Sequence, residues 1–102
     1  MTKIVYNACY GGFSLSDAAI ERYAELKGEA PLKENKWYEY RRNIPRHDPL
    51  LAQVVEELAD ASWGLFAELA ICELPPGTKY RIDEYDGLES VMAIDDYKWT
   101  IA

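Results

Sequence analysis

Two short segments of this 102-residue chain carry residue types that could bind an anion. Tyr10, Gly11 and Gly12 lie between an expected strand and an expected helix, where backbone amides at a helix N-terminus attract negative charge. Arg42 and Arg46 lie just before a second expected helix, and their guanidinium groups suit phosphate or carboxylate. These residues form a candidate site for a small anionic ligand of the nucleotide type. The alternative interpretation is a tight turn beside a solvated loop.

The sequence gives little support for catalytic or metal chemistry. His47 is the only histidine, so a histidine general base would have to be this residue. Cys9 and Cys72 are too far apart in the sequence for a zinc-binding spacing, and we expect them to be reduced, buried thiols. Ser14 and Ser16 lack the surroundings of a nucleophile elbow. We therefore expect no enzyme, no metal and no cofactor.

Acidic residues dominate the charge of the chain, which has 11 basic and 18 acidic side chains and a formal charge of −7. The excess lies in residues 51–102 and would repel nucleic-acid phosphates, so direct nucleic-acid binding is not expected. Such a surface either meets a basic surface on a partner or simply keeps the protein soluble. The carboxylates that we expect at a protein interface are Glu56, Glu57, Asp60, Asp83, Glu84, Asp86 and Glu89.

Length and composition predict a single domain over residues 1–102, of the α+β class. Apolar residues at helical spacing predict a first helix that ends at Gly28. Ser16 and Ser14 are the two candidates for its N-cap. Either choice leaves the glycine turn at the mouth of this helix.

A second helix is predicted to begin at Asp48-Pro49, because aspartate caps free amides and proline suits the first helical position. Its apolar stripe continues to about Trp63. Gly64 is predicted to end it in the left-handed conformation.

Strands are predicted where β-branched and aromatic residues dominate between turn signals. The segment 66–74 has apolar residues at both odd and even positions, which is typical of a central strand covered on both faces. Asp86-Gly87 predicts a hairpin turn, because both residues tolerate positive φ. The predicted strands are 3–8, 37–42, 66–74, 80–85 and 88–92, with 97–102 as a last short strand or a cover for the core. The expected order is β-α-β-α-β-β-β, a mostly antiparallel sheet with two helices packed on it and a C-terminal hairpin.

Four segments resemble a family of small hypothetical proteins from tailed phages and prophages. They are KIVYN at 3–7, CYGGFSLS at 9–16, RHDPL at 46–50 with VVEEL at 54–58, and YRIDEYDGLE at 80–89. The match spans almost the whole chain and identifies a family rather than an activity. It implies a protein of the host cytoplasm, in line with an N-terminus that has no signal-peptide pattern and a chain that has no long apolar run.

The resemblance favours one of two functional hypotheses. Small acidic phage proteins without catalytic machinery often act by binding, and inhibitors of CRISPR complexes and other defence systems are of this kind. The first hypothesis is therefore an anti-CRISPR-like inhibitor that binds a host protein or ribonucleoprotein complex, with nucleic-acid mimicry as one mechanism. The second is a small-ligand binder that sequesters a nucleotide-type defence signal at the glycine turn. Neither hypothesis requires a membrane, and both are compatible with a homo-oligomer.

Overall fold

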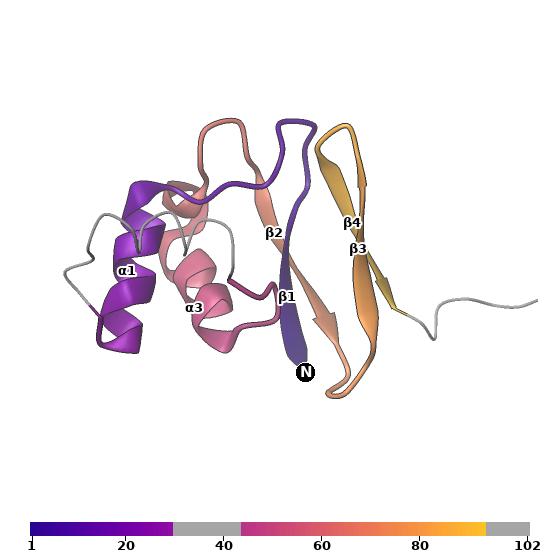
Figure 1. Ribbon diagram of the computed structural model, residues 1–102, viewed down its shortest axis with the longest axis horizontal. Coiled ribbons are helices and arrows are strands. Elements are labelled where there is room, and N and C mark those ends of the chain that lie inside the picture. The colour runs from indigo at the N-terminus through magenta and orange to yellow at the C-terminus, as the bar shows by residue number, and fades with distance from the viewer. Residues whose placement is uncertain (30–43, 94–102) are drawn as a thin grey trace, which may run out of the picture.

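The computed structural model describes residues 1–29 and 44–93 (Figure 1). In chain order its elements are β1 (Thr2–Asn7), α1 (Asp17–Lys27), α3 (Pro49–Leu58), the 3-10 helix η1 (Ala59–Ser62), β2 (Leu69–Leu74), β3 (Tyr80–Tyr85) and β4 (Leu88–Ala93). Two helices with antiparallel strand pairs confirm the predicted α+β class. The strand predicted at 37–42 and the segment predicted at 97–102 lie outside the described residues.

The described elements form three layers, with β1 and β2 in the middle (Figure 1). β1 pairs antiparallel with β2 in the register Thr2↔Leu74 to Asn7↔Leu69. β3 and β4 form a separate antiparallel hairpin that packs against β1 through β4. The two helices lie on one side of β1 and the hairpin lies on the other (Figure 1). Since strand side chains alternate, successive residues of β1 face different layers.

The two helices begin as the sequence predicted. The Ser16 hydroxyl accepts a hydrogen bond from the Ala19 amide at the start of α1, and Gly28 ends this helix at φ 76. Asp48 caps α3 by accepting from the Leu50 amide, with proline at the first helical position. Both helix starts are therefore encoded locally.

The second helix ends earlier than predicted. α3 stops at Leu58 and the chain tightens into η1, with Ala59 at φ 50. Gly64 does not adopt a positive φ, so its predicted role as a left-handed helix end is wrong. It serves close packing instead, because a Cβ at Gly64 would lie 2.2 Å from the Ser14 hydroxyl oxygen.

The main apolar core lies between the helices and β1. Val5 of β1, Ile20 and Tyr23 of α1, and Leu51 and Val54 of α3 are each 1% exposed or less. They belong to one cluster of packed side chains. Their burial holds the helical layer on the strand layer, at about 25 cal/mol per Å² of apolar surface removed from water.

β2 is not the central strand that its apolar sequence predicted. Among the described residues it pairs with β1 alone, and Leu69 is its one buried residue. β1 is enclosed more completely, because helices cover one side of it and the hairpin covers the other. Ile4, Val5 and Asn7 are accordingly almost fully buried.

Candidate protein-binding surface

Three turns meet at one end of the molecule, and we call residues 9–13, 64–68 and 84–88 the loop end (Figure 1). Their backbones touch where glycine leaves room. A Cβ at Gly11 would lie 1.7 Å from the Phe66 carbonyl oxygen. A Cβ at Gly87 would lie 2.3 Å from the Tyr10 carbonyl oxygen. Only glycine permits such close backbone approaches, so Gly11 and Gly87 allow the three turns to pack directly against one another.

The buried Asn7 side chain binds all three turns. Its amide nitrogen donates to the carbonyl oxygens of Cys9 at 2.7 Å and of Gly87 at 2.8 Å. Its amide oxygen accepts from the Glu68 backbone amide at 2.9 Å. An asparagine side chain has both donors and an acceptor, so one residue satisfies a backbone group from each turn.

The Cys9 thiol adds a further link within the loop end. Its sulfur donates to the Phe66 carbonyl oxygen at 3.0 Å and accepts from the Gly11 amide at 3.4 Å. The residue is half-buried rather than fully buried, as is Cys72. Both thiols are free, as predicted from the sequence.

Arg46 and Glu89 form an internal ion pair beneath the hairpin turn. The Nη1 and Nη2 atoms of Arg46 donate to the two carboxylate oxygens of Glu89 at 2.6 Å and 3.0 Å. Glu89 is 8% exposed and also accepts from the Asn7 backbone amide. The guanidinium lies 3.4 Å from the centre of the Phe13 ring. This bidentate pair joins β4 to the segment before α3, and the bond from the Asn7 amide joins Glu89 to the end of β1.

This pair corrects two expectations. Glu89 was expected at an exposed protein interface, but the alternation of the hairpin turns it inward, where Arg46 neutralises it. Arg46 was expected to hold a ligand anion, but both of its terminal guanidinium nitrogens, Nη1 and Nη2, are engaged by Glu89. Arg42 lies outside the described residues.

The glycine turn is not at the mouth of α1, so among the described residues Gly11 and Gly12 do not join the helix N-terminus as predicted. Residues 13–16 continue as an extended segment, with Leu15 bridged to Trp63 and the Ser16 amide donating to Ser62. α1 begins only at Asp17. Gly11 therefore packs against the 64–68 turn rather than presenting amides at a helix end.

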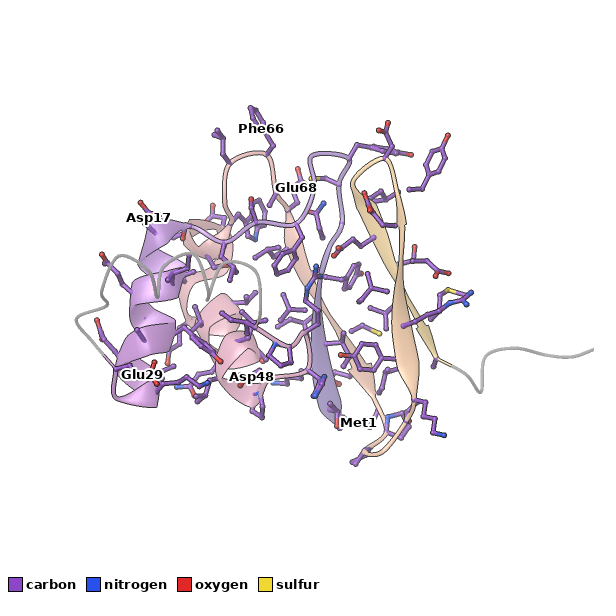
Figure 2. All side chains as sticks on the ribbon, viewed as in Figure 1. Met1, Asp17, Glu29, Asp48, Phe66 and Glu68 are labelled. Atoms are coloured by element: carbon purple, nitrogen blue, oxygen red, sulfur yellow. The ribbon has the colours of Figure 1, made fainter. Side chains whose placement is uncertain are left out.

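The loop end exposes large apolar side chains from all three turns. The exposed fractions are 64% for Tyr10, 79% for Leu65, 74% for Phe66 and 78% for Tyr85. Apart from Met1, they are the large hydrophobic residues exposed in the described part of the chain. Phe66 extends away from the end of the molecule in Figure 2. A concentration of apolar side chains in solvent is typical of an interaction surface.

Phe66 also has an unfavourable backbone. Its φ is 69, in the left-handed region that non-glycine residues rarely adopt. Strain of this kind concentrates at functional sites, where surrounding contacts hold it. Sequence reasoning missed Phe66 because it placed 66–74 in one apolar strand, and it did not single out Leu65. No local signal separates them from the strand, because Leu65, Ala67 and Leu69 stand at strand spacing.

The acidic face of α3 is largely compensated by basic neighbours. Glu56 forms an ion pair with Lys3, and Glu57 pairs with Arg22 at 2.9 Å. The hydrogen bond from Arg22 lowers the pKa of Glu57 below its ordinary value. Asp60 lies exposed in η1. These carboxylates do not converge with those of the hairpin, since the α3 face and the hairpin lie on opposite sides of β1.

The exposed carboxylates of the hairpin have separate surroundings. Asp83 pairs with Arg81 of the same strand at 2.9 Å. Glu84 accepts from the Gly87 amide at 3.1 Å and closes the turn. Asp86 is exposed at φ 52, followed by Gly87 at φ 89, which confirms the predicted hairpin turn.

His47 contacts a tyrosine at the other end of the molecule. Its Nδ1 lies 2.7 Å from the Tyr80 hydroxyl oxygen, and the two rings meet edge to face. Burial raises the pKa of the Tyr80 hydroxyl above its ordinary value. The contact joins the segment before α3 to the first strand of the hairpin. Within residues 1–29 and 44–93, no group of three or more metal-ligating side chains is placed to hold a metal ion.

Comparisons with known proteins give no further guidance. No protein-family model, curated protein or solved structure matches the chain. In the part of the chain that the structure describes, neither helix has the length and apolar character needed to span a bilayer.

Proposed function

We propose that this protein acts by binding another protein through the loop end. The observation that carries the proposal is the set of four exposed apolar side chains, which come from three segments far apart in the sequence. Aromatic side chains are the residues that most often anchor protein interfaces. The links through Asn7 and the glycine contacts arrange these side chains before any partner arrives, which lowers the entropic cost of binding.

The resemblance to phage proteins suggests the nature of the partner. We propose that the bound protein belongs to a host defence or nucleic-acid-processing complex in the host cytoplasm, and that binding inhibits it in an anti-CRISPR-like manner. A formal charge of −7 supports fast association with complexes whose surfaces are basic. The small-ligand alternative has no comparable support, because Arg46 is engaged and the glycine turn lies away from α1.

The experiment that tests this proposal compares three versions of the tagged protein as baits in a host-cell lysate. The first is the wild type, and the second is the double variant Leu65→Ala/Phe66→Ala, which removes two anchors. The third is the matched control Glu56→Gln/Glu57→Gln, which alters the α3 face instead. We expect a host protein to be retained by the wild type and the control and lost from the double variant. Equal retention by all three versions, or retention by none, would overturn the proposal.

A further inference from the structure

The charged side chains of the loop end are all carboxylates. Glu68 lies in the segment 64–68, and Glu84 and Asp86 lie in the segment 84–88. None of the three segments contains a lysine or an arginine. All three carboxylates are exposed. Figure 2 shows Glu68 on the same end of the molecule as Phe66. Negative charge and apolar surface therefore occupy the same face.

The acidic residues elsewhere in the described chain are compensated to a greater degree. Glu56 pairs with Lys3, Glu57 pairs with Arg22, and Asp83 pairs with Arg81. The loop end, by contrast, has no ion pair within its described residues that would neutralise Glu68 or Asp86. The surface that exposes the apolar anchors is thus also a surface whose negative charge is available to a partner.

A surface that exposes both aromatic rings and carboxylates is best suited to bind arginine side chains. A guanidinium group stacks on the face of tyrosine or phenylalanine and donates to carboxylates at the same time. Arg46 already adopts this arrangement within the molecule, between the Phe13 ring and Glu89. Tyr10, Phe66 and Tyr85 offer the rings at the surface, and Glu68 and Asp86 offer the acceptors.

We infer that the loop end receives an arginine-bearing segment of a partner protein, with arginine side chains over its aromatic rings and apolar neighbours against Leu65 and Phe66. This inference deepens the proposed function and rests on it. Anionic nucleic acid and anionic lipid do not fit the same face, because the carboxylates repel phosphate. The surface therefore selects a cationic protein segment.

A defined probe tests the chemistry without the natural partner. We would titrate the ¹⁵N-labelled full chain with a short capped peptide of alternating arginine and leucine, and follow amide chemical shifts. The matched control peptide replaces each arginine with citrulline, which keeps the shape and removes the charge. We expect shifts concentrated at the loop end and weak or absent binding of the citrulline peptide.

Protein variants then assign the recognition to the named side chains. We expect Glu68→Gln and Asp86→Asn each to lower the affinity for the arginine peptide by about three- to fivefold. Glu56→Gln is the control and should leave this affinity unchanged. Added salt should weaken binding as well. Equal binding of both peptides, shifts centred on α3, or no shift at millimolar peptide would overturn the inference.

The same variants separate this inference from the proposed function. If Leu65→Ala/Phe66→Ala loses the host partner while Glu68→Gln/Asp86→Asn retains it fully, the loop end binds a protein but does not select arginine. The inference then fails and the proposed function stands. If both pairs of substitutions retain the partner, both fail.

Discussion

The side chain of Asn7 and the backbone of Gly87 are 80 positions apart in the sequence and are joined by a hydrogen bond of 2.8 Å. Asn7 ends β1 and Gly87 forms the hairpin turn, so this bond connects the two strand pairs. The same side chain reaches the other two turns of the loop end. One fully buried amide therefore determines how the three turns are placed relative to the core.

Replacing Asn7 should destabilise the whole protein and the loop end most of all. Asn7→Ala leaves two carbonyl oxygens and one backbone amide without their partner, and we expect a loss of about 3 kcal/mol in the free energy of unfolding. Asn7→Asp keeps the shape but places a carboxylate against two carbonyl oxygens, so it should be at least as damaging. Urea unfolding measures the loss. A change below about 1 kcal/mol in both variants would show that the three turns are held by other contacts.

The Arg46–Glu89 pair should behave as a coupled unit. Arg46→Met leaves the nearly buried Glu89 carboxylate without its partner, and we expect a loss of about 3 kcal/mol. Glu89→Met should lower the free energy of unfolding by a similar amount, because the Arg46 guanidinium above the Phe13 ring then has no carboxylate acceptor. The double variant should lose clearly less free energy of unfolding than the sum of the losses in the two single variants. Urea unfolding of the four proteins gives the coupling energy, and additive losses would contradict a direct pair.

Local signals accounted for the parts of the fold that depend on neighbours in the sequence. The Asp48 cap, the Gly28 helix end and the Asp86-Gly87 turn are each encoded within a few residues and were predicted, and Ser16 was one of two candidates for the other cap. The end of α3 was not predicted correctly, because it depends on contacts between residues 62–64 and 14–16 across the molecule. Such pairings leave no trace in helical periodicity.

The candidate surface was only partly predictable for the same reason. Tyr10 and Asp86 were named in advance, but as members of two different hypothetical sites. Glu89 could not be separated from the exposed carboxylates until the hairpin was placed against Arg46. Phe66 reads as a strand residue in any local window, and its exposure depends on the late start of β2 at Leu69. The convergence of three turns is a long-range property.

The Tyr23 hydroxyl should make stability fall at high pH. It is buried and donates to Asp48, and both effects raise its pKa above the model-peptide value of 10.0. The folded state therefore holds this proton more tightly than the unfolded state. That contribution is complete below pH 10 and is lost as the pH rises above it, by up to about 1.4 kcal/mol per pH unit.

Tyr23→Phe provides the test of this pH dependence. The variant should be less stable by about 1 kcal/mol at neutral pH, because it lacks the hydrogen bond to Asp48. Above pH 10 the difference from the wild type should shrink, since phenylalanine has no proton to lose. Urea unfolding of both proteins across this range measures the difference. A constant difference would show that Tyr23 titrates alike in the folded and unfolded states.

Phe66→Gly should stabilise the protein while weakening the proposed binding of a partner. The backbone at φ 69 costs a residue with a side chain about 1 kcal/mol, and glycine adopts it freely. Because the ring is 74% exposed, little packing is lost with it. We expect the free energy of unfolding to rise by about 0.5–1 kcal/mol in Phe66→Gly and to change little in Phe66→Ala, which retains the strain. Both variants should bind the host partner more weakly than the wild type in the capture experiment. A marked loss of stability in Phe66→Gly would mean that the ring is held by the fold, and that its exposure does not serve a partner.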